Sequence, residues 1–216
     1  MNISFNELTE KLEARLKYLL PGPLAHEEMR AVPVGSIKPN FDHQSPPKAG
    51  SVLILLYPEQ EKIFFPLIQR SEYEGAHSGQ ISLPGGKAEA GEEPIATALR
   101  EGEEEIGVPA SQVNIIGKLS DFFVIPSNFL VTPVVGFLDH KPVFKADPVE
   151  VEKIIFGNLH DILRKDAIKT KEILAAGRYR VEAPHFEVED QLVWGATAMM
   201  LNELRMIVRE CYPIVY

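Results

Sequence analysis

The stretch from Gly86 to Val108 reads GKAEAGEEPIATALREGEEEIGV and predicts a glycine-led loop followed by a helix. The helix is expected from about Pro94, because proline suits the first helical turn, where its missing N–H costs nothing. Glu92 and Glu93 favour a helix N-terminus, whereas Gly107 offers a stop. The apolar residues that recur at helical spacing, and that we expect to face a core, are Ile95, Leu99 and Ile106.

Three glutamates of the predicted helix share one face. Glu101, Glu104 and Glu105 stand at positions i, i+3 and i+4, which are neighbours on a helix surface. Carboxylates gathered in this way repel one another, and a hard divalent cation such as Mg²⁺ or Mn²⁺ would relieve the repulsion through oxygen ligands. Arg100 adjoins this face and could neutralise or orient one carboxylate. The alternative is a solvated acidic face, which is what most runs of glutamate are.

The complete spacing favours the metal-binding alternative, because it resembles the Nudix box. The fixed positions, in order, are Gly86, Glu92, Arg100-Glu101, Glu104-Glu105 and Gly107-Val108. Agreement at so many positions is far more specific than a lone glycine pattern. One position departs, because Gly102 stands where the family usually has an aliphatic residue. Glycine there loosens the helix by about 1 kcal/mol relative to alanine.

The resemblance implies an α/β fold of the Nudix type, an α/β/α sandwich around a mixed β-sheet. It also implies hydrolysis of a diphosphate linkage assisted by Mg²⁺ or Mn²⁺, which would polarise phosphoryl oxygens and activate a water. By the same resemblance Glu101, Glu104 and Glu105 would hold the ions, with the backbone carbonyl of Gly85 or Gly86 as a further ligand.

Three further residues receive roles from the resemblance. Glu92 would pair with Arg100 and fix the entry into the helix, supporting the site from behind. The family often places another glutamate in a later loop, as metal ligand or base, and this maps onto Glu150. A solvated loop acid explains Glu150 equally well. Either Glu104 or Glu150 would take the proton of the attacking water, and the sequence does not choose between them.

The segment before the box resembles the coenzyme A diphosphatase branch of the Nudix family. The branch typically shows an arginine, then a histidine-x-glycine-glutamine run, then Phe-Pro-Gly-Gly. Here Leu83 replaces the phenylalanine, and Glu74-Gly75 stands where many members have leucine-arginine. By resemblance, the residues expected to bind substrate are Arg70, His77, Gln80, Gly85 and Gly86. Strings at 131–136 and 194–198 also resemble this branch, so the resemblance covers about Ser51 to Val208.

Composition limits the other function classes. The chain has 216 residues, 45% hydrophobic, and a net charge of −9, which argues against a general partner of nucleic acids or anionic membranes. A single domain over 1–216 is expected, with an N-terminal helix and irregular extension at 1–50 and the Nudix core at 51–208. The lone Cys211 and the absence of a visible signal peptide fit a cytoplasmic location.

The remaining elements follow from periodicity and turn signals. Residues 21 to about 50, rich in proline, are predicted to be irregular, and Pro133 is expected to demote its strand to an edge or bulged one. The N-terminal helix is expected to pack at the domain edge, with a homodimer contact as the lesser alternative. The predicted helices are 5–20 and one opening at Trp194; the predicted strands are 51–57, 62–70, 113–119, 129–138 and 154–156, with a hairpin within 169–182.

Three functions remain open from the sequence. The first is hydrolysis of coenzyme A or its derivatives to 4′-phosphopantetheine and 3′-phospho-ADP, as the branch resemblance implies. The second is a Nudix pyrophosphatase acting on ADP-ribose, NADH or a dinucleoside polyphosphate. The third is a non-catalytic module that binds a nucleotide, against which the intact set of box glutamates argues.

Overall fold

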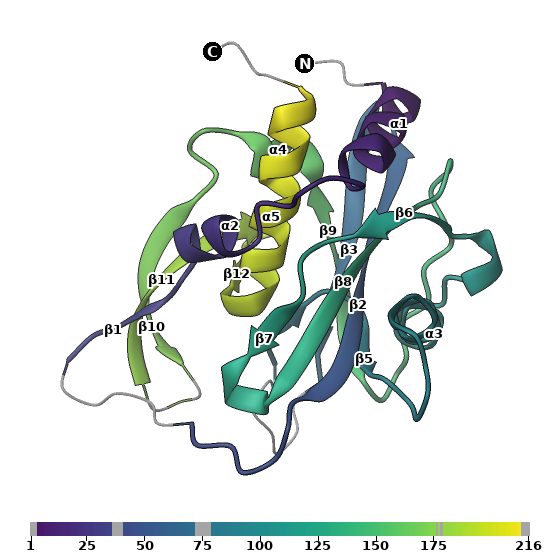
Figure 1. Cartoon of the computed structure of the whole chain (residues 1–216). Helices are drawn as coiled ribbons and strands as arrows, with labels where there is room; N and C mark the ends of the chain where they lie inside the picture. The colour runs from purple at the N-terminus through teal and green to yellow at the C-terminus, as the bar shows by residue number, and fades with distance from the viewer. Residues whose placement is uncertain (1–3, 36–40, 72–78, 176, 178, 213–216) are drawn as a thin grey trace.

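The computed structural model describes residues 4–35, 41–71, 79–175, 177 and 179–212. The elements below carry the labels of Figure 1. The helices are α1 (Phe5–Arg15), α2 (Pro23–Glu28), α3 (Pro94–Ile106), α4 (Leu159–Leu163) and α5 (Gly195–Cys211), with 3-10 turns η1 (Ala110–Gln112) and η2 (Ile125–Ser127). The strands are β1 (Val32–Pro33), β2 (Lys48–Glu59), β3 (Lys62–Arg70), β4 (Ile81–Ser82), β5 (Gly85–Lys87), β6 (Asn114–Lys118), β7 (Phe122–Val124), β8 (Phe129–Phe137), β9 (Val151–Asn158), β10 (Lys169–Ala175), β11 (Tyr179–Val188) and β12 (Gln191–Trp194).

Eight of the strands form one mixed sheet. Its order is β4-β3-β2-β8-β6, with β5 paired to β2, β7 to β8 and β9 to β3. The pair β2–β8 is parallel and the other pairs are antiparallel. The long apolar runs of β2 and β3 are buried on both faces, which explains why they read as continuous hydrophobic stretches.

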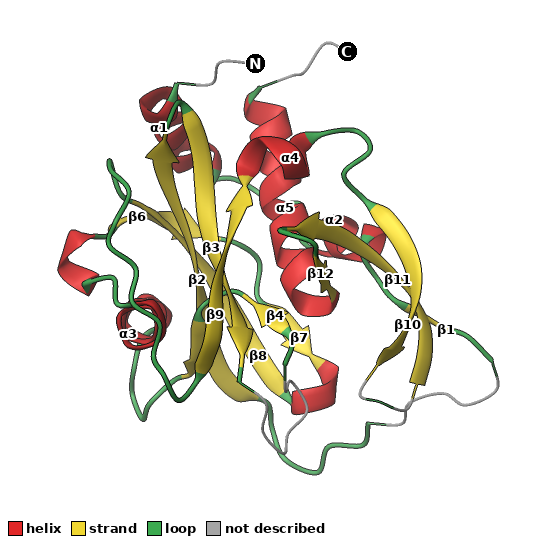
Figure 2. Cartoon of the chain, turned by 180° about the vertical axis from the view of Figure 1, so that it is seen from behind, coloured by secondary structure: helices red, strands yellow, loops and turns green. Residues whose placement is uncertain are grey.

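Helices cover both faces of this sheet. Leu53, Leu55 and Tyr57 of β2 pack with residues of α3, whereas the alternate residues Ile54 and Leu56 share a core with α1 and α5. The two sets alternate because successive strand side chains point to opposite faces. Figures 1 and 2 show α3 on one side of the sheet and α5 with α1 on the other. The α/β/α sandwich around a mixed sheet is therefore confirmed.

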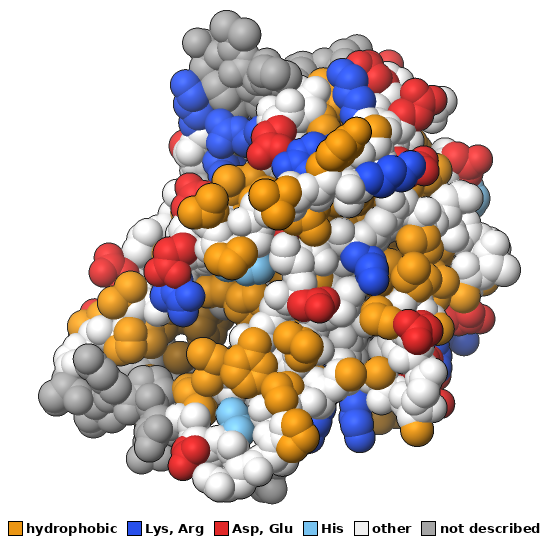
Figure 3. Space-filling model, in the orientation of Figure 1, with side chains coloured by type: hydrophobic (Ala, Val, Ile, Leu, Met, Phe, Trp, Pro, Cys, Tyr) orange, Lys and Arg blue, Asp and Glu red, His pale blue; other side chains and the backbone are white. Residues whose placement is uncertain are grey.

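A second sheet lies beside α5. Strand β11 pairs with β1 and β10 along its first part and with β12 near its end. The predicted hairpin within 169–182 is confirmed as β10 and the start of β11. In Figure 1 these two strands extend as an arm away from the main sheet. Figure 3 shows apolar side chains around a hollow between this arm and β7, and lysines and arginines interspersed with acids elsewhere on that face.

The face that α3 presents to the sheet agrees only in part with the one predicted. Ile106 is buried, as predicted, and Leu99 is half-buried, but Ile95 is exposed, so its assignment to the core is wrong. Ala98 and Gly102 are buried instead. A Cβ added at Gly102 would lie only 2.9 Å from Cδ2 of Leu53. Small residues therefore let α3 approach β2 closely, which explains why glycine replaces the expected aliphatic residue at position 102.

Pro133 does not place β8 at an edge. Strand β8 lies between β2 on one side and β6 with β7 on the other, so that prediction is wrong. The Pro133 carbonyl accepts a hydrogen bond from Leu119 N at 2.9 Å. Since N–H and C=O of one strand residue point to the same side, the missing N–H faces the gap between β6 and β7. The irregularity lies instead in β6, between Ile115 and Gly117.

The N-terminal segment contains more structure than predicted. Helix α1 ends at Arg15 rather than at Leu20, and Leu16 then packs closely over Gly117, while Leu19 is exposed. The prediction that residues 21–50 are irregular is wrong for α2, β1 and the first residues of β2.

A buried carboxylate fixes α2 in place. Glu203 of α5 accepts hydrogen bonds from Gly22 N at 3.0 Å and Ser120 Oγ at 2.7 Å, and lies 3.0 Å from His26 Nε2. These long-range contacts carry no local sequence signal, which is why the sequence of this segment is typical of a loop.

Among the described residues, every helix is too short or too polar to span a membrane.

Candidate functional site

The site is built where β5 passes beneath α3. Gly85 has φ of +153°, and a Cβ there would lie 2.3 Å from the Ser51 carbonyl oxygen and 2.6 Å from Val52 Cα. Only glycine fits this position. The conformation turns the Gly85 N–H toward α3, where it donates to Glu105 Oε2 at 2.7 Å.

Glu105 is the most buried acid of this site. Its side chain is 1% exposed, and Arg70 Nη1 at the end of β3 lies 3.4 Å from Oε1. Oε1 itself accepts no hydrogen bond from the described residues. Burial raises the pKa of Glu105 to about 7, against the opposing effects of Arg70 and the Gly85 N–H.

Glu101 lies against Gly86. A Cβ at Gly86 would meet the Glu101 carboxylate at 2.5 Å, so this glycine leaves the room that the carboxylate occupies. Burial raises the pKa of Glu101 as well, although its hydrogen bond with Arg100 opposes the shift. A Cβ at Gly50 would lie 2.7 Å from the Gly86 carbonyl oxygen, so that oxygen points toward β2.

Arg100 binds three carboxylates of the box. Its Nε and Nη2 donate to the two oxygens of Glu92, both at 2.9 Å, and Nη1 donates to Glu101 at 2.8 Å and Glu104 at 2.9 Å. The paired guanidinium lowers the pKa of Glu92 to about 2. Thr97 Oγ1 also donates to Glu92 at 2.9 Å. The predicted pairing of Glu92 with Arg100 at the helix entry is therefore confirmed.

The donor chemistry of this region suits a hard divalent cation, although the side chains are not already grouped as a metal site. No three His, Cys, Asp or Glu side chains among the described residues form such a group. One reason is that Arg100 holds an oxygen of both Glu101 and Glu104. The buried Oε1 of Glu105 and the carboxylate of Glu101 are nevertheless oxygen donors of the kind that Mg²⁺ and Mn²⁺ take.

Glu150 lies within electrostatic range of the same acids. Its negative charge contributes to the raised pKa of both Glu101 and Glu105. The carbonyl oxygen of Glu150 accepts a hydrogen bond from Ser71 N at 3.0 Å, which joins its loop to the end of β3 beside Arg70. A residue 45 positions after Glu105 in the chain is thus brought to the same site.

Gln80, another residue predicted to bind substrate, lies beside Arg70. Its backbone carbonyl accepts a hydrogen bond from Arg70 N at 3.1 Å. His77 and Glu74-Gly75 lie outside the described residues. Glu104 is largely exposed at the outer end of the acidic face.

Asp147 was missed by the sequence reasoning. It accepts hydrogen bonds from the backbone N–H groups of Val149 and Glu150, in the loop that carries Glu150. The Asp-Pro pair at 147–148 is a turn signal that could have identified it.

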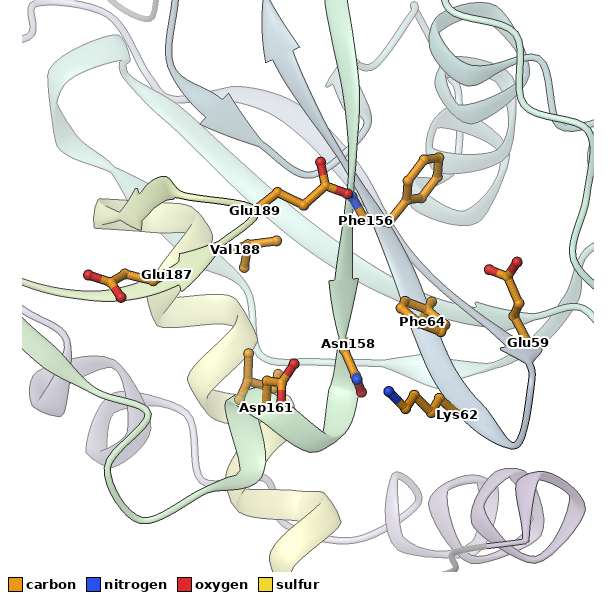
Figure 4. Close-up of a pocket in the computed structure, with 10 residues that line it drawn as sticks. Glu59, Lys62, Phe64, Phe156, Asn158, Asp161, Glu187, Val188 and Glu189 are labelled. Atoms are coloured by element: carbon orange, nitrogen blue, oxygen red, sulfur yellow. The ribbon is translucent and has the colours of Figure 1, made fainter.

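A separate pocket lies at the opposite end of β3. It is lined by residues around Phe64, Phe156 and Glu189 (Figure 4). Lys62 in this pocket and Arg70 at the site stand at the two ends of the strand, roughly 26 Å apart. Three of its acids pair with lysines, namely Glu59, Glu187 and Glu189. The pocket is therefore distinct from the acidic site.

Comparison with known proteins gives matches along most of the chain. Residues 47–177 match the model of the NUDIX domain. A protein described as an uncharacterized Nudix hydrolase NudL of Yersinia enterocolitica is 34% identical over 172 residues, which are 79% of this chain and 83% of that protein. The Nudix hydrolase NudL of Yersinia pestis is 35% identical over 140 residues, 64% of this chain and 69% of the relative.

Solved structures share the fold at lower identity. The Nudix hydrolase RenU from M. smegmatis superposes with a TM-score of 0.53 at 16% identity, covering 80% of this chain and 91% of that one. A MutT/nudix family protein from Enterococcus faecalis gives a TM-score of 0.50 at 17% identity, covering 96% and 76%. At these identities the structural likeness concerns the fold alone.

Proposed function

Because this chain belongs to the Nudix hydrolase family, we propose that it hydrolyses the diphosphate linkage of coenzyme A or its derivatives with Mg²⁺ or Mn²⁺. The observation that carries the proposal is the buried Glu105, which is fixed by the Gly85 N–H and lies near Glu101 and Glu150. The expected products are 4′-phosphopantetheine and 3′-phospho-ADP.

The coenzyme A assignment rests mainly on the segment before the box, and one structural feature supports it. Phe123 of β7 and Ile125 of η2 expose much of their apolar side chains. Strand β7 pairs with β8 at Phe129 to Val131, and this part of β8 pairs with the start of β2, which also pairs with β5. This apolar surface is separated from the glycine strand β5 by β8 and β2, and we take it as the surface that would contact the pantetheine arm of the substrate.

Glu101, Glu104 and Glu105 are the proposed side-chain ligands, with a glycine carbonyl as a further ligand. Of the two glycines, Gly85 is favoured over Gly86, because the Gly86 carbonyl points toward β2. When bound, the metal supplies polarisation of phosphoryl oxygens and a lower pKa for the attacking water.

The surrounding residues bind and orient. Arg100 is oriented by its hydrogen bond to Glu92, and it donates hydrogen bonds to Glu101 and Glu104, which orients these two carboxylates. Arg70 at the end of β3 is proposed to contact phosphate oxygens, together with Gln80 and His77. Glu150 or Glu104 would accept the proton of the attacking water. Glu150 is the better candidate, because Arg100 already binds one Glu104 oxygen.

We also propose that residues 1–216 form one Nudix domain that works in the cytoplasm. Leu8 and Leu12 of α1 and Met29 at the C-terminal end of α2 share a core with α5, which supports one unit. The acidic net charge of −9 supports a small-molecule partner rather than nucleic acid or a membrane.

The test is incubation of the purified protein with coenzyme A and Mg²⁺ or Mn²⁺, followed by mass analysis of the products. We expect 4′-phosphopantetheine and 3′-phospho-ADP, with activity lost on addition of a chelator and regained on excess metal. ADP-ribose, NADH and a dinucleoside polyphosphate are assayed in parallel. Cleavage of one of these without cleavage of coenzyme A would favour the broader pyrophosphatase, and binding without cleavage of any would favour a nucleotide-binding module.

A further inference from the structure

The C-terminal end of α3 is attached to the loop that follows β8. Lys145 N donates to the Ile106 carbonyl at 3.0 Å and Asp147 N to the Glu105 carbonyl at 3.1 Å. Both carbonyls belong to the last turn of the helix, where no further turn exists to use them. Gly107 has φ of +71°, and a Cβ there would lie 2.9 Å from Lys145 Cβ. The final glycine of the box thus makes room for this loop.

Asp147 then accepts hydrogen bonds from the backbone of residues 149–151. Its Oδ1 accepts hydrogen bonds from Val149 N at 2.8 Å and Glu150 N at 2.9 Å, and its carbonyl oxygen accepts one from Val151 N at 3.1 Å. A carboxylate that accepts from two consecutive N–H groups is a strong turn-forming contact, because the acceptor is charged. The backbone of Glu150 is therefore set by the side chain of Asp147.

The other side of the loop is attached to the end of β3. Ser71 N donates to the Glu150 carbonyl at 3.0 Å. Arg70 pairs with Val151 just after a shift of register, and irregularities of this kind re-aim side chains next to active sites. The loop of Asp147 and Glu150 is thus attached at both ends to the site. Asp147 N bonds the Glu105 carbonyl, and the Glu150 carbonyl bonds Ser71 N. Arg70, next to Ser71, in turn pairs with the Glu105 side chain.

We propose that Asp147 is a positioning residue that holds Glu150 toward Glu101 and Glu105. This inference rests on the proposed function, in which Glu150 acts in diphosphate hydrolysis. Asp147 works through the backbone of Glu150, and its own N–H ties the loop to the end of α3. Its loss should therefore reduce the chemical step without affecting the binding of substrate elsewhere.

The experiment compares Asp147→Ala, Asp147→Asn, Glu150→Gln and the double variant Asp147→Ala/Glu150→Gln. Asp139→Ala is the matched control, because Asp139 is an exposed aspartate near the start of the same connection. One readout is kcat and KM for the cleaved diphosphate. The second is hydrogen exchange of the Val149 and Glu150 amides in the metal-free protein, which requires no activity.

For Asp147→Ala we expect kcat to fall about 10- to 100-fold with little change in KM, and the two amides to exchange about tenfold faster or more. Asparagine keeps an acceptor oxygen, so Asp147→Asn should recover most of the activity. The double variant should be no slower than Glu150→Gln within about twofold, because Asp147 acts only through Glu150. Asp139→Ala should match the wild type.

Unchanged exchange in Asp147→Ala would overturn the inference, and so would unchanged kcat or an additive loss in the double variant. A different pattern separates it from the proposed function. If the wild type cleaves no diphosphate but the two amides still lose protection, the proposed function fails while the structural role of Asp147 is upheld.

Discussion

Glu105→Gln is expected to lower diphosphate hydrolysis by at least about 100-fold while leaving the fold intact. Substitutions of residues that only support metal ligands already cost about 10- to 100-fold, and Glu105 is proposed to be a direct ligand. Glutamine has nearly the same shape, so its amide oxygen can still accept the Gly85 N–H that Glu105 accepts at 2.7 Å. Turnover of coenzyme A and circular dichroism of the same preparation are the measurements.

Glu103→Gln is the matched control on the same helix. Glu103 is exposed and accepts a hydrogen bond from Ala110 N at 2.9 Å, away from the acidic site. It should retain wild-type turnover. Full activity in a folded Glu105→Gln variant would contradict the assignment of Glu105 as a metal ligand.

Glu105→Gln should also change how the free energy of unfolding depends on pH. Burial raises the pKa of Glu105 in the folded state to about 7 from 4.5, so the folded state binds the proton more tightly than the unfolded chain. Below pH 4.5 this difference in proton affinity takes nothing from the free energy of unfolding, so the contribution of protonated Glu105 is fully present. The contribution is lost as the pH rises through 7. Glutamine cannot ionise and should therefore escape this loss, worth at most about 3 kcal/mol above pH 7.

Urea unfolding of metal-free protein at pH 5 and pH 8 measures this effect. The free energy of unfolding of Glu105→Gln, relative to the wild type, should be higher at pH 8 than at pH 5. Glu103→Gln should show no such difference. An equal pH dependence in Glu105→Gln and the wild type would mean that Glu105 is ionised at little cost in the folded protein.

Gly85→Ala is the second substitution with a large expected effect, a loss of about 3–5 kcal/mol in the free energy of unfolding. The added Cβ would lie 2.3 Å from the Ser51 carbonyl oxygen, 2.6 Å from Val52 Cα and 2.7 Å from Val52 Cγ1, and φ is +153°. Two of these contacts are with backbone, which cannot rotate away, so strain and overpacking add. Thermal and urea unfolding provide the measurement.

Gly91→Ala separates the two causes. Gly91 also has positive φ, at +79°, but a Cβ there meets nothing within 4 Å. It should lose only about 1–2 kcal/mol, the cost of a left-handed backbone for a non-glycine residue. If Gly85→Ala were no less stable than Gly91→Ala, the close approach of β5 to β2 would not be the reason for glycine at position 85.

The parts of the fold that the sequence predicts are those with local causes. Helix α3 follows from Pro94, the acidic residues before it and the stop at Gly107, and its acids are placed by helical spacing alone. Strands β2 and β3 follow from their apolar runs. The boundaries of these elements differ from the predictions by only a few residues.

The parts that the sequence does not predict depend on distant partners. Pro133 is tolerated in a central strand only because β6 ends and β7 begins opposite it. The core face of α3 is set by the approach to Leu53, and not by the apolar residue Ile95. Helix α2 depends on Glu203. In each case the deciding contact lies far away in the chain, where periodicity carries no information.

The candidate site also has one part that local sequence predicts and one part that depends on distant contacts. Glu92, Arg100 and the box glutamates lie within one local unit, and the pairing of Glu92 with Arg100 is confirmed. Glu150 reaches this unit through a loop whose geometry depends on Asp147; the Asp-Pro pair signals a turn there, but the hydrogen bonds that Asp147 makes are seen only in the structure. The roles proposed for these residues in catalysis stay predictions until the variants above are measured.

The buried contact of Glu203 with His26 has a consequence for the order of folding. These residues are 177 positions apart, whereas β2, β5 and α3 follow one another within a short length of chain. Contacts between nearby residues form faster than those that must close a long loop, although the equilibrium cost of the longer loop grows only slowly. The glycine strand and its acidic helix should therefore assemble early, and α1 and α2 should join α5 late.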